Sequence, residues 1–464
     1  MRVRTGQFRL DALLIRRKQT TRHKTEERNW NRPRQVEENL SYLHTPVTRT
    51  QIVFCSPGGI SPPGFSWRFS TLCFHINPFF RMNHHFDVII IGAGIMGSAA
   101  AAQLARRGRK VLLLDQFTPP HANGSSHGES RVIREAYFEH PAYVPLIQRA
   151  YELWQELEQE SGGSLLKITG GLMIGPENGA VFGGSRRSAE EHKLPHEILT
   201  AEQVNARFPA FNMPEDFLAV HEPRAGMLFA EKCHQALLDE ASAHGVVFRW
   251  NETVESWTAS DQHVEVTTRT GRYQAEQLVI AAGPWAGQIV SALQGRLTVE
   301  RQVMHWFDPA ARLADFVPDS FPVHVWEYEH GKYFYALPDA GSGVKTAIHH
   351  QGEITSVSTV NRTVTEDDKL VMQQLVAKFL PSLNRPPHRS AVCLYTNTAD
   401  EHFLVDWHPE FQNVLMMSPC SGHGFKFAPA LGEIAADLLT NGKSRFDIAL
   451  FGYGQPRWES DPPG

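Results

Sequence analysis

A glycine-rich turn between two short apolar runs constrains the fold of this chain more than any other feature. Residues 86–91 (FDVIII) form a β-branched apolar run, which is typical of a buried parallel strand. The turn GAGIMG (residues 92–97) and an alanine-rich stretch follow, and a second apolar run, residues 110–114, closes on Asp115. Strand, turn, helix and strand occur in this order within about 30 residues, which predicts a βαβ unit.

The three glycines of the turn have separate physical roles. Gly92 permits the tight turn, Gly94 lets backbone amides approach a pyrophosphate, and Gly97 lets the helix pack closely on the sheet. The phosphates would lie at the helix N-terminus, and Asp115 would accept a hydrogen bond from a ribose hydroxyl. We therefore predict a dinucleotide site; the alternative is a βαβ unit that serves packing alone.

A later β-rich stretch bears on which dinucleotide binds. Four segments predict a β-meander leading into a strand that rejoins the parallel sheet: residues 246–249, 254–257, 264–268 and 277–280. The last segment leads into AAG (residues 281–283), whose small residues would let the backbone approach a cofactor. This arrangement, with the βαβ unit at the start of the fold, favours FAD over NAD.

The predicted fold class is α/β, with a Rossmann-type FAD-binding domain and an inserted antiparallel-sheet substrate domain. We assign residues 82–165, 225–300 and 390–455 to the FAD-binding domain, and residues 166–224 and 301–389 to the substrate domain.

The first 81 residues differ from the rest in charge. They carry 14 Lys and Arg against 5 Asp and Glu, whereas the remaining residues carry 31 against 45. They show no sustained apolar period, and Met82 begins a stretch that reads like a natural protein start. We expect residues 1–81 to be an unstructured or non-native extension. The alternative is a nucleic-acid-binding or partner-binding arm, because clustered arginines are the electrostatic footprint of such arms.

Composition excludes several classes of protein. The chain has no run of about 18 apolar residues, so we predict no membrane span. Its five cysteines are scattered and form no CxxC pair, so neither a disulfide framework nor a zinc site is indicated. This cysteine usage suits a reducing compartment, and we predict a cytoplasmic protein without a metal.

Three longer motifs carry a resemblance to a known family. They are HANGSSHGESRVIREAYFEHPAY (residues 121–143), CLYTNTADEHFLVD (393–406) and SGHGFKFAPALGEIAADLL (421–439). Together with the glycine turn, they resemble the monomeric sarcosine oxidase and N-methyltryptophan oxidase family, in the expected order from Met82 to about Phe451. These motifs are much more specific than the glycine turn, and residues 1–81 fall outside the resemblance.

The resemblance implies a covalent flavin. Cys393 matches the residue that forms a thioether to the C8 methyl group of the flavin ring. Taken alone, a single cysteine in an apolar stretch is more often a buried small hydrophobe. We expect that ordinary packing role for Cys233 and Cys420.

Lys345 matches the family lysine that lies beside the flavin and promotes its reaction with oxygen. An ammonium group in a water-poor site would stabilise the negative charge that develops on oxygen. A solvated strand lysine is the ordinary alternative.

Arg134 and Lys426 match two cations that bind the substrate carboxylate. Arginine offers a planar fork for a carboxylate and lysine adds a point charge, although both residue types are usually surface charges. His127 and Arg131 match residues on the other face of the flavin, where they help to position the ring and Lys345.

The remaining candidate residues line the pocket or hold the flavin. Those that match pocket residues near the substrate nitrogen are Tyr335, His349 and Tyr395. A loop whose amides would bind the flavin pyrimidine carbonyl comprises Gly422, His423, Gly424 and Phe425. A lone histidine or tyrosine is more often a satisfied core residue, so none receives a firm acid or base role.

The implied reaction is oxidation of the C–N bond of an N-methyl amino acid to an imine. Hydrolysis then gives the demethylated amino acid and formaldehyde, while oxygen becomes hydrogen peroxide. An oxidase or dehydrogenase of a cyclic or primary amino acid, such as pipecolate or glycine, is the alternative. A flavin-bound regulatory or nucleic-acid-binding protein is less consistent with these motifs. The expected partners are a small amino acid and oxygen, with no nucleic acid and no membrane, and the family is often monomeric.

Two stretches depart from the family pattern. Residues 309–325 are hard to align, and residues 347–350 (AIHH) carry a doubled histidine where a glycine followed by an aromatic residue or a lysine is more usual. Both departures leave the identity of the substrate open.

Overall fold

The predicted βαβ unit forms the centre of a sheet in this computed structural model, which describes residues 85–455. Strand β1 (His85–Ile91) pairs in parallel with β2 (Val111–Leu114) on one side and with β12 (Arg272–Ile280) on the other. The parallel order extends to β9 beyond β2 and to β20 beyond β12. The other strands of this eight-stranded sheet are β9 (Val247–Arg249), β10 (Val254–Ala259), β11 (Val264–Thr268), β19 (Leu404–Trp407) and β20 (Val414–Ser418).

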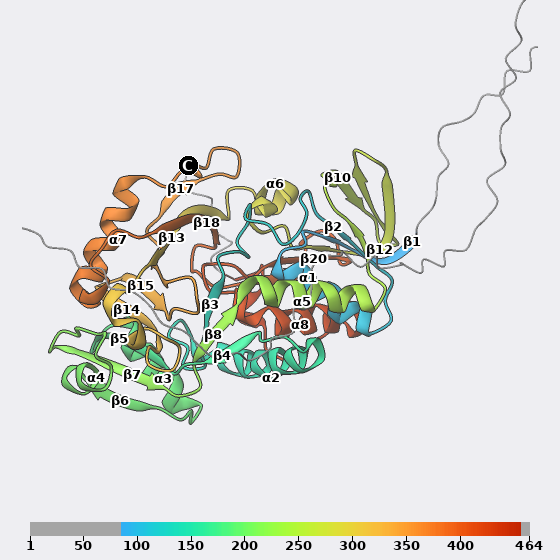
Figure 1. Cartoon of the computed structure of the whole chain (residues 1–464). Helices are drawn as coiled ribbons and strands as arrows, with labels where there is room; N and C mark the ends of the chain where they lie inside the picture. Colours follow the sequence, from blue (N-terminus) through green and yellow to red (C-terminus); the bar gives the residue numbers. More distant parts are fainter. Residues whose placement is uncertain (1–84, 456–464) are drawn as a thin grey trace, which may run out of the picture. The chain divides into compact units, whose positions relative to one another are not determined.

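A layer of helices covers one face of this sheet (Figure 1). Val88, Ile89 and Ile90 are fully buried, because helices and further strands exclude water from both faces of a parallel strand. The helices of the layer are α1 (Ile95–Arg106), α5 (Ala230–Ala243) and α8 (Ala428–Asn441), and α2 (Val144–Ser161) packs against α5 and α8. Helices α1 and α8 approach closely, since a Cβ on Gly432 would lie 2.6 Å from the carbonyl oxygen of Ala99.

A second, largely antiparallel sheet has nine strands. The order of its strands is β17-β13-β16-β15-β14-β5-β7-β6, and β18 also pairs with β13. Strands β14 and β5 are its one parallel pair within the described chain. Its strands are β5 (Gly171–Pro176), β6 (Glu197–Thr200), β7 (Phe217–Glu222), β13 (Thr298–Phe307), β14 (Val323–Glu329), β15 (Lys332–Leu337), β16 (Val344–His349), β17 (Glu353–Thr355) and β18 (Arg389–Asn397). Trp326, Phe334 and Phe379 pack in its core.

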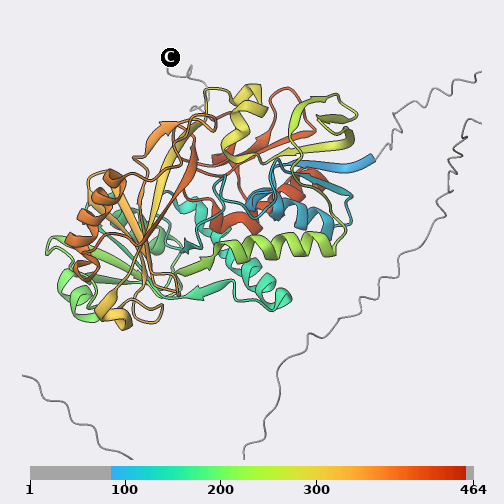
Figure 2. The ribbon, with the colours of Figure 1, turned by 45° about the horizontal axis from the view of Figure 1, so that its top comes forward.

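The remaining helices connect these elements. They are α3 (Ala180–Glu191), α4 (Ala201–Arg207), α6 (Ala286–Ile289) and α7 (Glu366–Phe379), with the short 3₁₀ helices η1 (Pro141–Tyr143), η2 (Gly283–Trp285), η3 (Ser291–Leu293), η4 (Ala310–Asp315), η5 (Pro381–Leu383), η6 (Phe425–Phe427) and η7 (Ala449–Phe451). Figure 2 shows the green and orange segments of the second sheet gathered on one side and the blue and red segments of the parallel sheet on the other.

A small three-stranded sheet lies between the two larger ones (Figure 1). It has the order β3-β8-β4 and consists of β3 (Ser130–Ile133), β4 (Leu166–Ile168) and β8 (Gly226–Phe229). Strand β3 carries Arg131 and leads directly to Arg134, so this sheet delivers two predicted site residues to the junction of the two sheets.

The predicted fold class is confirmed, and two details differ from the sequence analysis. Residues 247–249 do not belong to the meander, because β9 pairs in parallel with β2 instead. Strand β18 joins the antiparallel sheet through β13, although residue 390 was the predicted start of the last FAD-binding segment. The predicted extension, residues 1–81, lies outside the described residues. Between residues 85 and 455 no helix is long and apolar enough to cross a membrane.

Candidate active site

The glycine turn has the tight geometry that its sequence predicts. Gly92 has a φ of +99°, and a Cβ there would lie 2.4 Å from the Ala281 carbonyl oxygen. A Cβ on Gly97 would lie 1.8 Å from the Gly92 carbonyl oxygen, so α1 packs this closely only because Gly97 has no side chain. Gly94 is the N-cap of α1 and lines a neighbouring cavity, while the Ile95 amide that follows donates to Ser126 Oγ at 3.0 Å.

The Asp115 carboxylate is fixed beside this turn. Its Oδ2 accepts a hydrogen bond from the Ala93 amide at 2.8 Å, and its Oδ1 accepts one from the Phe117 amide at 2.8 Å. Each oxygen keeps a further lone pair for a donor such as a ribose hydroxyl.

A cavity of about 580 Å³ runs from the glycine turn to the junction of the two sheets. The predicted residues that line it are Gly92, Gly94, Asp115, Arg131, Arg134, Tyr335, His349, Cys393, Tyr395, Gly422, His423, Gly424, Phe425 and Lys426. Three predicted site residues, Gly97, His127 and Lys345, do not line it. Residues predicted from distant parts of the sequence therefore meet around one space.

The residues around this cavity fit a bound FAD. The dinucleotide end offers the N-terminus of α1 and a fixed carboxylate, which are the groups that bind pyrophosphate and ribose. At the other end Cys393 is 3% exposed, and its thiol makes only long contacts, 4.0 Å to the Ser125 carbonyl oxygen and 3.9 Å to the Leu394 carbonyl oxygen.

Arg134 lies buried at the far end of the cavity and is held by a carboxylate of the same chain. Its Nη2 donates to both carboxylate oxygens of Glu139, at 2.8 and 2.7 Å. Its guanidinium also lies 4.2 Å from the Tyr137 ring centroid and 4.4 Å from that of Phe138. Although burial opposes the charge, the Glu139 carboxylate raises the pKa of Arg134 above its usual value.

Lys426 also lies against Tyr137, with its Nζ 5.3 Å from the ring centroid. Its Nζ donates to the His423 carbonyl oxygen at 2.7 Å and to the Tyr137 hydroxyl at 3.3 Å. Burial, followed by repulsion from Arg134, lowers the pKa of Lys426 to about 7. An anion that entered between Arg134 and Lys426 would favour the charged lysine.

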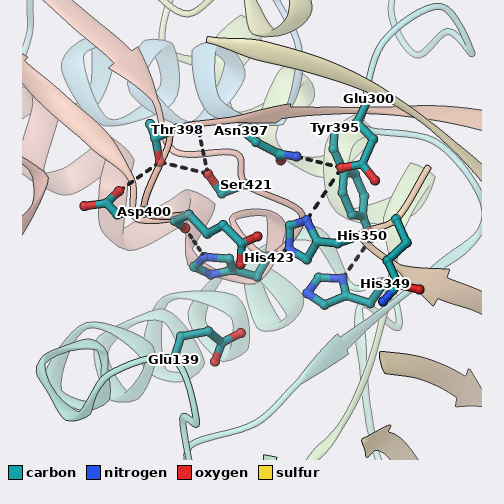
Figure 3. A network of polar contacts seen from close by, with 12 residues as sticks. Glu139, Glu300, His349, His350, Tyr395, Asn397, Thr398, Asp400, Ser421 and His423 are labelled. Atoms are coloured by element: carbon teal, nitrogen blue, oxygen red, sulfur yellow. Dashed lines mark hydrogen bonds and ion pairs between the residues drawn. The ribbon is translucent and has the colours of Figure 1, made fainter. Parts of the chain in front are cut away.

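A histidine network forms another wall (Figure 3). His349 Nδ1 lies 3.2 Å from the Tyr395 hydroxyl, and the His349 ring centroid lies 4.3 Å from that of His350. The two ring nitrogens of His350 lie 3.6 Å from carboxylate oxygens of Glu300 and Glu401. Burial, and next the neighbouring His350, holds the pKa of His349 well below its usual range, so His349 is neutral.

His423 is neutral as well. Its Nδ1 lies 2.6 Å from the Tyr137 hydroxyl and its Nε2 lies 3.0 Å from the Glu401 carbonyl oxygen, while burial lowers its pKa to about 3. Tyr335 lines the same region, and burial raises its pKa to about 12.

Lys345 and Arg131 are held by backbone carbonyls of one turn. Lys345 is 1% exposed and its Nζ donates to the carbonyl oxygens of Gly128, at 2.8 Å, and Ser130, at 2.6 Å. Arg131 Nη2 donates to the His127 carbonyl oxygen at 2.5 Å. Burial, followed by Arg131, holds the pKa of Lys345 well below its usual range, and burial lowers that of His127 to about 4.

Two acidic residues near Arg134 were missed by the sequence analysis. Glu139 follows Arg134 by five residues in the same motif, so an acid beside a predicted carboxylate-binding arginine could have been noted. Glu222 accepts hydrogen bonds from the Glu135 and Ala136 amides at 2.7 and 2.8 Å. No local signal points to Glu222, because it comes from β7, far along the chain.

The fold and the site together define a dinucleotide-binding oxidoreductase of α/β class. The model of the family described as FAD dependent oxidoreductase matches residues 87–438. The chain belongs to this family, and its cofactor is FAD.

Curated relatives align with about four fifths of this chain. A monomeric sarcosine oxidase of Streptomyces avermitilis is 40% identical over 374 residues, which is 80% of this chain and 97% of that protein. An N-methyl-L-tryptophan oxidase of Yersinia pestis is 33% identical over 368 residues, 79% of this chain and 98% of that protein. The L-proline dehydrogenase of P. horikoshii has a similar fold, with a TM-score of 0.69 and 22% identity over 79% of this chain and 96% of that one.

Proposed function

We propose that this protein is an FAD-dependent oxidase of N-methyl amino acids, of the sarcosine or N-methyl-L-tryptophan type. The observation that carries the proposal is the pair Arg134 and Lys426, two buried cations that both lie against the Tyr137 ring, at 4.2 and 5.3 Å from its centroid, and both line the cavity. Two cations converging on one small space suit a ligand with a carboxylate. The sarcosine oxidase and N-methyl-L-tryptophan oxidase relatives support this substrate class.

The residues proposed to hold the cofactor follow the cavity. The amides of Gly94 and of the N-terminus of α1 would bind the pyrophosphate, Gly92 and Gly97 would permit the tight turn and the close packing, and Asp115 would bind the ribose. In the loop Gly422–Phe425 the amides of His423 and Gly424 donate to the Cys420 carbonyl oxygen, at 3.0 and 3.1 Å, so the amides of Gly422 and Phe425 would hydrogen-bond the flavin ring. FAD would supply the two-electron oxidation of the C–N bond.

We further propose that Cys393 attaches the flavin covalently. Its thiol lines the cavity, and the long contacts of its sulfur leave it available for a thioether. Cys420 also lines the cavity, where burial raises its pKa to about 11, so its thiolate is scarce at neutral pH. Cys233 is an inert buried thiol whose pKa is raised by burial.

The substrate carboxylate would bind between Arg134 and Lys426. Because Glu139 occupies the fork of Arg134, the entering carboxylate must share the guanidinium with Glu139 or displace it. Lys426, with a pKa near neutrality, would become fully charged when the carboxylate binds. Arg134 would therefore give up part or all of its ion pair with Glu139 and form an ion pair with the substrate carboxylate.

The substrate nitrogen would face the histidine wall. His349 is neutral and already engages Tyr395 through Nδ1, which leaves Nε2 for the amine. Tyr335 and Tyr395 would fix the orientation of the N-methyl group. His127 and Arg131 belong to the turn behind Lys345 and would position that lysine, whose ammonium would promote the reaction with oxygen.

The overall reaction balances with oxygen and water. An N-methyl amino acid, O₂ and H₂O would give the demethylated amino acid, formaldehyde and H₂O₂, through an imine that water hydrolyses. The partners are thus a small amino acid and oxygen, and we propose a monomer because the sarcosine oxidase relatives carry that description.

A screen under air tests the proposal. Sarcosine, N-methyl-L-tryptophan, pipecolate and glycine should be compared, with hydrogen peroxide and formaldehyde measured together. We expect equal amounts of both products from an N-methyl amino acid, and little product from its methyl ester, which has no carboxylate. Peroxide without formaldehyde from glycine or pipecolate would replace the proposed substrate class. Substrate reduction of the flavin that is not followed by peroxide under air would indicate a dehydrogenase.

A further inference from the structure

The N-terminal turn of α5 places a carboxylate against the turn that precedes β3. Glu231 is half-buried, and its Oε1 accepts hydrogen bonds from the amides of Gly128, at 2.7 Å, and Glu129, at 3.1 Å. Its Oε2 accepts a second hydrogen bond from the Glu129 amide at 2.9 Å. The Ala230 amide in turn donates to the Glu129 carbonyl oxygen at 2.8 Å. The start of α5 therefore binds this turn through both amides and a carbonyl.

The turn has a conformation that needs such support. Gly128 has a φ of +105° and Glu129 a φ of +67°, and a residue with a side chain rarely adopts a positive φ. A Cβ on Gly128 would lie 2.6 Å from Met304 Sδ, so the turn also lies tightly against β13. External hydrogen bonds must hold a backbone of this kind, and Glu231 provides three of them.

The same turn holds Lys345 from its other side. The carbonyl oxygens that accept from Lys345 Nζ belong to Gly128 and Ser130. The Gly128 carbonyl and the Glu129 amide are the two ends of a single peptide group. This peptide lies between the Glu231 carboxylate and the Lys345 ammonium, and each charge polarises it in the direction that strengthens the other contact.

We propose that Glu231 is a positioning residue for Lys345, which it orients and keeps charged through the peptide group between Gly128 and Glu129. The inference rests on the proposed role of Lys345 in the reaction with oxygen. Within the described residues, the hydrogen-bond partners of Lys345 Nζ are two neutral carbonyl groups, and neither is a carboxylate. Glu231 thus supplies at a distance the negative charge that the buried ammonium lacks in its immediate surroundings.

The charges around Lys345 agree with this role. Burial and then Arg131 on β3 lower the pKa of Lys345, while Cys393 on β18 (only while its thiol is free), Glu231 on α5 and Glu129 in the turn raise it. His127, in the same turn, is neutral at physiological pH. Removing the Glu231 charge should therefore lower the pKa of Lys345 further, and the ammonium should be lost at a lower pH.

The test separates the two halves of the catalytic cycle. Stopped-flow measurements should follow flavin reduction by substrate without oxygen, and then reoxidation in air, for Glu231→Gln, Glu231→Asp, Lys345→Met and the double variant Glu231→Gln/Lys345→Met. Glu129→Gln is the matched control. It removes a charged side chain from the same turn, but it leaves the hydrogen bonds between the Glu231 carboxylate and the turn's amides in place. The Glu129 carboxylate pairs instead with Arg389 Nη1 at 2.6 Å.

We expect Glu231→Gln to slow reoxidation by about tenfold or more while flavin reduction changes little. The alkaline limb of its reoxidation rate against pH should move to lower pH, and Glu231→Asp should restore part of the rate. Glu129→Gln should have a smaller effect. The double variant should be no slower than Lys345→Met, because Glu231 acts through the lysine.

A crystal structure of Glu231→Gln gives a readout independent of activity. We expect the peptide between Gly128 and Glu129 to rotate, or Lys345 Nζ to leave one of its two carbonyls. An unchanged turn with both Nζ contacts intact and an unshifted pH limb would overturn the inference, as would equal slowing of both half-reactions. If Lys345→Met reoxidises at the wild-type rate, the proposed role of Lys345 fails first. If Glu231→Gln reoxidises at the wild-type rate and Lys345→Met does not, the inference fails and the role of Lys345 stands.

Discussion

The pKa of Lys426 leads to a prediction about how the carboxylate site responds to pH. With a pKa of about 7 in the free enzyme, Lys426 is charged below neutrality and progressively neutral above it. A bound carboxylate raises this pKa, so an anion should bind more weakly as the pH rises through 7. The dissociation constant should increase by up to about tenfold per pH unit.

The contact itself limits the size of this effect. A charge-assisted hydrogen bond contributes about 1.5–3 kcal/mol, which corresponds to roughly 10- to 150-fold in binding. Between pH 6 and pH 9 the dissociation constant should therefore rise by a factor in that range and then level off. Lys426→Met should bind the anion as weakly at pH 6 as the wild type does at pH 9, with a nearly flat pH profile.

The assay uses a ligand that cannot react. (Methylthio)acetate has the shape of sarcosine with sulfur in place of nitrogen, so it offers the carboxylate without an ionisable amine. Its binding can be followed through the absorption spectrum of the resting flavin at each pH. Arg134 keeps its charge throughout, because its pKa is raised.

A second group titrates in the same range and decides how the result is interpreted. Burial raises the pKa of Glu222, which holds the amides after Arg134, to about 7. If the pH dependence near 7 survives in Lys426→Met, it belongs to Glu222 or another group, and the reasoning about Lys426 is refuted.

Three further predictions follow from the geometry of the site. When the protein is precipitated with acid, Cys393→Ser should release its flavin into the supernatant, whereas the wild-type precipitate should stay yellow. A colourless wild-type precipitate from flavin-replete protein would contradict covalent attachment. Gly97→Ala should incorporate less FAD during folding, measured as the ratio of flavin to protein absorbance, because its Cβ would lie 1.8 Å from the Gly92 carbonyl oxygen. Gly183→Ala on α3 is the control, since its Cβ would meet nothing nearer than 3.7 Å, and equal flavin loss in both variants would contradict the explanation. Glu222→Gln should raise KM by about tenfold with little change in the rate of flavin reduction at saturating substrate, because it loosens the amides after Arg134; an unchanged KM would remove Glu222 from this role.

The sequence predicts those parts of the site that short segments encode. The glycine turn, Asp115 and the strands on either side lie within one βαβ unit, where hydrophobic pattern and glycine spacing determine the geometry together. The residues around Cys393 and Lys426 could be placed in the site only through longer motifs, because a cysteine or a lysine alone has no distinguishing pattern.

Contacts between distant segments could not be predicted in this way. Glu231 lies about a hundred residues beyond the turn that it holds, and an acidic residue near the start of a helix is common. The short segment at residues 247–249 has the same apolar pattern whether it joins a meander or the parallel sheet, and its pairing with β2 depends on the crossover through α5. The pairing of β18 with β13 likewise depends on tertiary packing rather than on local pattern.

The close packing of Gly432 on Ala99 has a consequence for how the protein is made. Helix α1 lies near the start of the described chain and α8 near its end, and β20 completes the parallel sheet shortly before α8. A ribosome must therefore synthesise nearly all of the described residues before the cofactor domain can close, so β1 and α1 emerge long before their later partners β12 and α8 do. Their exposed apolar faces would meanwhile be open to chaperones and to aggregation. Flavin capture should consequently be one of the last steps in the biogenesis of the enzyme, after translation rather than during it.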